Sequence, residues 1–74
     1  MEIKDIMNHV NESIHLHDST IHIEYVSHDD DGLVMQVIIL THADKFMGLK
    51  NIAKIINRTL NKYNLKLKSL SLKK

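Results

Sequence analysis

Apolar residues recur at two different spacings along the chain, and the spacing separates helical from extended segments. From residue 3 to residue 14 an apolar side chain appears every three or four positions, with polar residues between. This spacing predicts an amphipathic helix over about residues 2–13. Ile21, Ile23 and Tyr25 then occupy every second position, which predicts a strand with one buried face.

A second strand follows a tight turn. Residues 29–32 read Asp-Asp-Asp-Gly, and both residue types tolerate the positive φ of hairpin turns. Residues 33–40 are apolar on both faces except at Gln36, which is typical of a central strand. These two strands should form a hairpin. The pattern leaves open whether residues 14–17 end the first helix, form a loop or add a short strand.

The helical spacing returns after Thr41. Apolar residues at positions 49, 52, 53, 56, 60 and 63 fall within about a third of the circumference of a helix. Asn64 is suited to end that helix in the left-handed conformation. Residues 65–72 predict a last strand, in which Leu65 and Leu67 alternate out of step with the leucines that follow. That change of face predicts a bulge or a late start near Leu67.

The element order α-β-β-α-β predicts a single α+β domain over residues 1–74. A helix between the second and third strands favours a right-handed crossover with the third strand parallel to the second. We therefore expect a three-stranded mixed sheet with two helices on one face. The predicted core includes Ile6, Val10, Ile21, Ile23, Val37, Ile39, Ile52, Ile56 and Leu60.

Charge is divided almost completely at Asp44. Residues 1–44 hold all nine acidic side chains and one lysine, a formal charge of −8, whereas residues 45–74 hold nine cations and no acid. Four of these cations stand at strict i, i+4 spacing on the second helix, on the arc opposite its apolar residues. They are Lys50, Lys54, Arg58 and Lys62, and we call them the basic stripe.

The basic stripe has three interpretations. Like charges one turn apart destabilise an isolated helix by roughly 0.2–0.5 kcal/mol per pair, so the stripe does not stabilise its own helix. Its spacing matches the phosphates of a nucleic acid or another polyanion, and Lys66 and Lys68 would extend the surface. It could instead dock on an acidic protein, including a second copy in a homodimer, or be a solvated face.

Aromatic residues are few, which bears on how a nucleic acid could be bound. Single-strand binders stack bases on exposed rings, and the chain has only Tyr25, Phe46 and Tyr63. We therefore expect backbone contacts with weak sequence preference.

All six histidines lie in the acidic part of the chain. His15, His17 and His22 are candidate metal ligands because His15 and His17 would share a face if extended, but no recognised metal-binding spacing supports a site.

Other function classes receive little support. The sequence has no phosphate-binding glycine loop, no nucleophile motif and no cysteine, so we expect a non-enzymatic protein without a cofactor. The absence of cysteine fits a reducing cytoplasm. No segment is apolar enough for a membrane span, and the N-terminus carries acids where a signal peptide is basic. A chain of 74 residues buries only roughly 60% of its unfolded surface, which makes self-association plausible.

Two short motifs resemble the BolA family. Phe46-Met47-Gly48 precedes the second helix, and Leu67-Lys68-Ser69-Leu70-Ser71-Leu72 forms the strand after it, where that family has an F-x-G motif and an I-H-A-L-S-type strand. The resemblance implies an α-β-β-α-β fold related to type II KH domains and a role as a protein-interaction adaptor. The histidine of the family's last strand corresponds to Lys68 here, so we expect no iron–sulfur ligation.

Overall fold

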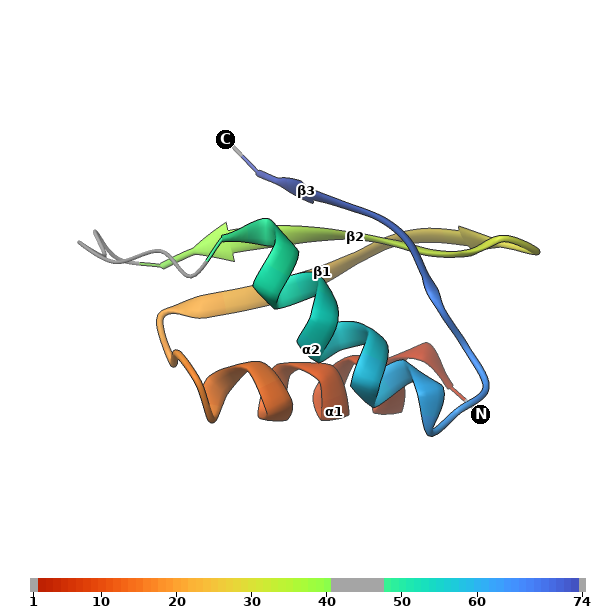
Figure 1. The fold of residues 1–74 in the computed structure, drawn as a ribbon, viewed down its shortest axis with the longest axis horizontal. Coiled ribbons are helices and arrows are strands. Elements are labelled where there is room, and N and C mark those ends of the chain that lie inside the picture. Colours follow the sequence, from red (N-terminus) through yellow and green to blue (C-terminus); the bar gives the residue numbers. More distant parts are fainter. Residues whose placement is uncertain (1, 41–47, 74) are drawn as a thin grey trace.

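The computed structural model describes residues 2–40 and 48–73, and their element order confirms the predicted α+β fold (Figure 1). The elements are α1 (Ile3–His15), β1 (Ile21–Asp29), β2 (Gly32–Ile39), α2 (Leu49–Asn61) and β3 (Leu67–Leu72). The strands lie in the order β1-β2-β3. β2 pairs antiparallel with β1 and parallel with β3, which confirms the predicted mixed sheet.

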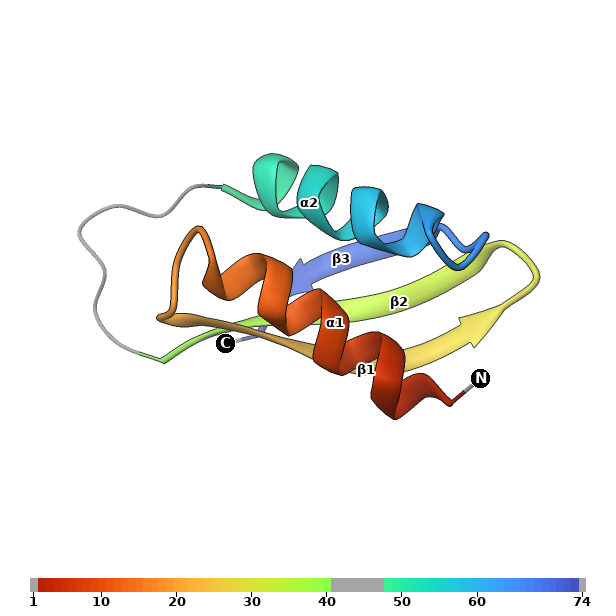
Figure 2. The same ribbon diagram turned by 90° about the horizontal axis from the view of Figure 1, so that it is seen from below.

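Both helices cover the same face of the sheet (Figures 1 and 2). α1 packs on β1 and on α2, while α2 packs on β3. The helices therefore form one layer and the sheet a second, and the outward arc of each helix is left to solvent. Within the described residues, no helix has the length and apolar character needed to cross a membrane.

The core lies between these two layers and draws on all the elements except β3, of which Leu67 and Leu70 pack at its border. Every residue predicted for the core is buried except Ile39. That prediction was wrong because Ile39 is the last residue of β2, at the end of the sheet, where it is only partly covered. Ile14, Leu33 and Met35 are buried but were not predicted.

Two register shifts interrupt the pairing of the strands. In β1 the register shifts between Tyr25 and Ser27, and pairing then continues to Asp29, beyond the predicted end of the strand. In β3 the register shifts between the partners Leu67 and Ser69, so Lys68 is the extra residue of a bulge. This bulge, at the predicted position, lets Leu70 pack against the core as Leu67 does, whereas Leu72 is exposed.

The helix ends also follow local chemistry. Asn64 has φ 58°, which confirms the predicted left-handed residue after α2. The undecided segment 14–17 is the end of α1 followed by a turn, in which the backbone N–H groups of His17 and Asp18 both donate to the Ile14 carbonyl at 2.9 Å.

An asparagine ties each helix to the backbone of an edge strand. The Asn11 side chain of α1 accepts a hydrogen bond from the Ile23 N–H at 2.7 Å and donates to the Ile23 carbonyl at 3.0 Å. It thereby supplies both hydrogen bonds that a neighbouring strand would give at this position of β1. The Asn57 side chain of α2 accepts from the Leu67 N–H at 3.0 Å, at the residue where β3 begins.

Gly32 permits the close approach of β3 to the start of β2. Its φ is +138°, and a Cβ atom added there would lie 2.5 Å from the Lys66 carbonyl oxygen. The next residue, Leu33, donates its N–H to that same oxygen at 2.9 Å. A side chain at Gly32 would therefore separate the two strands where their pairing starts.

Replacing Asn11 should measure its contribution to helix docking. We expect Asn11→Ala to lower the free energy of unfolding by about 1–3 kcal/mol, because it leaves the Ile23 backbone groups without their partner. Asn8→Ala, at an exposed position of the same helix, should change it by less than about 0.5 kcal/mol. Urea denaturation of the two variants gives the comparison, and equal losses would contradict the assigned role.

A pair of glycine variants should separate strain from steric contact. Gly32→Ala and Gly48→Ala each force an alanine into a positive φ, at a cost of about 1–3 kcal/mol. A Cβ at Gly48 meets nothing within 4 Å. Only Gly32→Ala should therefore lose about 1–3 kcal/mol more of its free energy of unfolding, through overpacking. Chemical denaturation measures both, and a similar loss in the two variants would show that the strand approach tolerates a methyl group.

Candidate anion-binding surface of helix α2

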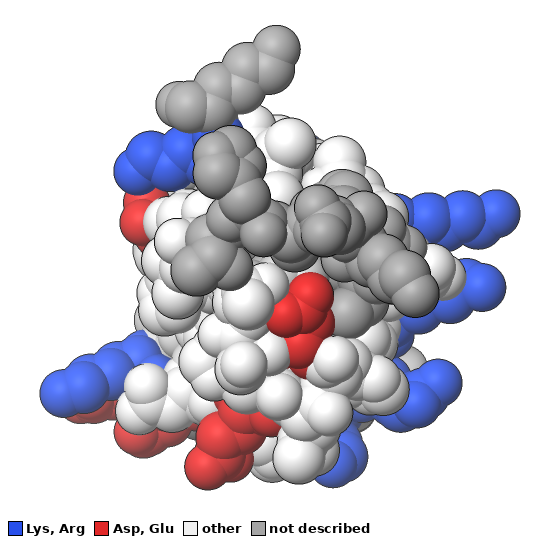
Figure 3. All heavy atoms as spheres, turned by 90° about the vertical axis from the view of Figure 1, so that its left-hand side faces the viewer, with Lys and Arg blue, Asp and Glu red and all other residues white. Residues whose placement is uncertain are grey.

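Helix α2 presents a buried face and a cationic face. Its buried residues are Ile52, Ile56, Thr59 and Leu60, whereas every residue of the basic stripe is exposed. Because α2 packs on β3 and α1 along its apolar arc, the stripe lies on its solvent side. Figure 3 shows Lys and Arg side chains projecting in a row from one flank of the molecule, without acidic side chains among them.

The basic stripe has no ion-pair partner within residues 2–40 and 48–73. α2 itself contains no acidic residue. Two other lysines are paired, since Lys68 contacts Asp29 and the Lys73 Nζ lies 3.7 Å from a Glu24 carboxylate oxygen. Asp29 and Glu24 therefore neutralise cations of β3 and its end, and the charge of α2 remains available to an outside anion.

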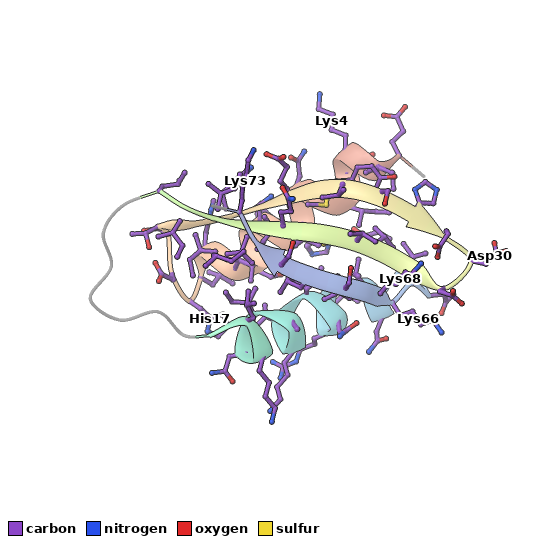
Figure 4. The ribbon with its side chains drawn as sticks, turned by 90° about the horizontal axis from the view of Figure 1, so that it is seen from above. Lys4, His17, Asp30, Lys66, Lys68 and Lys73 are labelled. Carbon is purple, nitrogen blue, oxygen red and sulfur yellow. The ribbon has the colours of Figure 1, made fainter. Side chains whose placement is uncertain are left out.

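The two further candidate cations behave differently. The Lys68 ammonium donates a hydrogen bond to the Asp29 carboxylate, which holds it at the hairpin end of the sheet. Lys66 is exposed and lies beside Lys68 at that end (Figure 4). Lys66 can extend the surface, whereas Lys68 would have to leave Asp29 first.

The candidate metal ligands do not come together. His15 ends α1 and His17 lies in the following turn, so they do not share the extended face that would let both bind one ion. His22 is on β1. Within the described residues, no group of three or more histidine, cysteine, aspartate or glutamate side chains is arranged to hold a metal.

The two described tyrosines are half-buried and hydrogen-bonded to histidines. The Tyr63 hydroxyl lies 2.7 Å from His9 Nδ1, which links the end of α2 to α1. The Tyr25 hydroxyl contacts His28 Nδ1 across the β1 bulge. Both rings pack against the core, so they are poorly placed for base stacking. Phe46 and Met47, part of the motif shared with the BolA family, lie outside the described residues.

A pocket between the helices adjoins the basic stripe and was not foreseen from the sequence. It has a volume of about 180 Å³ and lies between the C-terminal end of α1 and α2. Arg58 and Lys62 line it, together with Ser13, His17 and Thr59. No sequence signal links Ser13 to Thr59, because the contact between them depends on how the two helices cross.

Comparisons with known proteins found no matching family model, no matching curated protein and no matching solved structure. The resemblance to the BolA family therefore rests on its two short motifs. Any function must be argued from the geometry and charge of the surface.

The Asp29–Lys68 pair should make part of the stability pH-dependent. The Lys68 hydrogen bond, followed by the Asp31 backbone N–H, lowers the pKa of the Asp29 carboxyl below its ordinary value. A lowered folded-state pKa adds stability above the unfolded value of about 3.9, and this is lost as pH falls through the folded-state pKa. We expect Lys68→Met to raise the pKa of Asp29 and to remove this pH-dependent contribution to stability.

Carboxyl ¹³C NMR titration of wild type and Lys68→Met measures the pKa directly. Thermal melts between pH 2 and 7 measure the pH-dependent contribution to stability. An Asp29 pKa that is the same in both proteins would show that the ion pair does not persist in solution.

Proposed function

We propose that this protein is a small non-enzymatic binding domain that contacts the phosphate backbone of nucleic acid through the basic stripe of α2. The observation that carries the proposal is that all four cations are exposed and unpaired within the described residues. Repulsion between successive cations costs the helix free energy. An anionic partner would offset that cost and release its own counterions.

The dimensions of the stripe suit a nucleic acid backbone. Lys50 and Lys62 are twelve residues apart, which corresponds to roughly 18 Å along a helix axis. Each strand of duplex DNA carries one negative charge per roughly 3.4 Å of the axis, so this length of one strand offers about five phosphates. The four cations are therefore no more numerous than the phosphates of a single strand over the same length.

The proposed binding is weakly selective for sequence. Base readout needs donors and acceptors in a groove, or exposed rings for stacking. The described tyrosines are half-buried, and the stripe consists of phosphate-binding side chains. Contacts of this kind set affinity and orientation but carry little sequence information.

The salt dependence of binding tests the number of phosphate contacts. With four contacts, log K should fall with log salt at a slope of about −3 to −4, the smaller value applying to single strands. Each single change of Lys50, Lys54 or Lys62 to alanine should reduce the slope by roughly one. Fluorescence anisotropy with labelled duplex and single-stranded oligonucleotides at several salt concentrations provides the measurement.

A charge-matched pair of double variants tests the location. Lys54→Glu with Arg58→Glu should weaken binding by about 100-fold or more, because contacts are replaced by repulsion from phosphate. Thermal stability should be unchanged or slightly higher, since each reversed charge faces a stripe lysine one turn away. Lys4→Glu with Lys73→Glu takes the formal net charge from +1 to the same −3 and should weaken binding by no more than about threefold.

Equal loss of binding in the two double variants would assign the effect to net charge and reject the stripe. Light scattering after size-exclusion chromatography, with and without nucleic acid, gives a second criterion. A doubled mass without nucleic acid, abolished by Lys54→Glu with Arg58→Glu, would assign the stripe to self-association instead.

A further inference from the structure

The pocket between α1 and α2, which we call the interhelical pocket, has a polar inner wall. Thr59 forms part of this wall and is 4% exposed, the one polar side chain that is buried within the described residues. Its Oγ1 lies 3.0 Å from Ser13 Oγ and 3.2 Å from the Ile55 carbonyl oxygen. The wall therefore holds two hydroxyl groups contributed by different helices.

The hydroxyl pair can donate one hydrogen into the interhelical pocket. Thr59 carries one hydroxyl hydrogen, and its two acceptors are Ser13 Oγ and the Ile55 carbonyl. Ser13 also carries one hydroxyl hydrogen, which it can donate either to Thr59 Oγ1 or to a ligand oxygen in the pocket. When Ser13 donates to the ligand, Thr59 can donate to Ser13 in turn.

The rim of the interhelical pocket is cationic. Arg58 and Lys62, the last two members of the basic stripe, line it from α2, and His17 lines it from the turn after α1. Its lining, within the described residues, includes no carboxylate. Arginine presents a planar fork of N–H donors that matches phosphate geometry, while lysine supplies a point charge. Leu16 and Ile55 complete the wall with apolar surface.

The volume of the interhelical pocket, about 180 Å³, is large enough for one tetrahedral anion with some water. The charge at its rim and the hydroxyl groups at its inner wall suit a single phosphate group.

We propose that the interhelical pocket seats one phosphate group, held by Arg58 and Lys62 and oriented by the Ser13 hydroxyl. This proposal deepens the proposed function and rests on it for the partner. The remaining stripe cations bind the backbone beside that group. Seating one phosphate at the end of the stripe would fix the register of the strand along α2, which the exposed lysines alone do not do.

Inorganic phosphate is the first probe, because it tests the interhelical pocket without nucleic acid. In ¹H–¹⁵N NMR titrations we expect the largest shifts at residues 13, 17, 58, 59 and 62. Ser13→Ala should weaken phosphate binding by about tenfold, the effect of one hydrogen bond to a charged group. Ser69→Ala removes an exposed hydroxyl from β3 and should leave the affinity within twofold of wild type.

Thr59→Val provides a second variant that keeps the shape of the buried side chain. It removes the hydroxyl that positions Ser13, so we expect a smaller loss of about threefold. Wild-type phosphate affinity in both variants, or shifts spread evenly along the basic stripe, would overturn the proposal. Melting temperatures of all the variants identify any change that arises from unfolding.

Two oligonucleotides of one sequence, with and without a 5′-phosphate, identify the source of the phosphate. Tighter binding of the phosphorylated strand, lost in Ser13→Ala, assigns the interhelical pocket to a terminal phosphate. Equal binding of the two strands, with the same loss in Ser13→Ala, assigns it to a backbone phosphate. Nucleic-acid binding that is unaffected by Ser13→Ala rejects the pocket and keeps the proposed function. Phosphate binding without nucleic-acid binding keeps the pocket and rejects the proposed function.

Discussion

Burial of one face of α2 is the constraint on which the rest of the structure depends. Ile52, Ile56 and Leu60 are fully buried between the sheet and α1, and each such side chain contributes about 1.5–3 kcal/mol relative to exposure. The same burial fixes the rotation of the helix about its axis. The basic stripe must then face outward, despite the repulsion between its members.

The path of the chain around α2 depends on the approach of β3 to β2. β3 can lie parallel to β2 because Gly32 leaves room for the Lys66 carbonyl and Asn57 receives the first N–H of the strand. Asn11 gives α1 a corresponding anchor on β1. In a chain of this size, such hydrogen bonds between layers supplement a small hydrophobic core.

The charge division of the sequence becomes a division in space. Asp29 and Glu24 pair with lysines of β3 and its C-terminal end, whereas the four cations of α2 stay unpaired among the described residues. The proposed phosphate contacts follow from this arrangement. They combine a row of exposed cations with one more enclosed position, the interhelical pocket, where hydroxyl groups add direction to charge.

The sequence by itself determined the elements, the strand order and the direction of the basic stripe. These features depend on local periodicity, which neighbouring residues already specify, and on the parallel pairing that a helix between two strands favours. Only the tertiary structure decided the Ser13–Thr59 and Asp29–Lys68 contacts, which join residues 46 and 39 positions apart. Such contacts depend on helix crossing and on the bulge at Lys68, and small shifts in register decide which distant side chains meet.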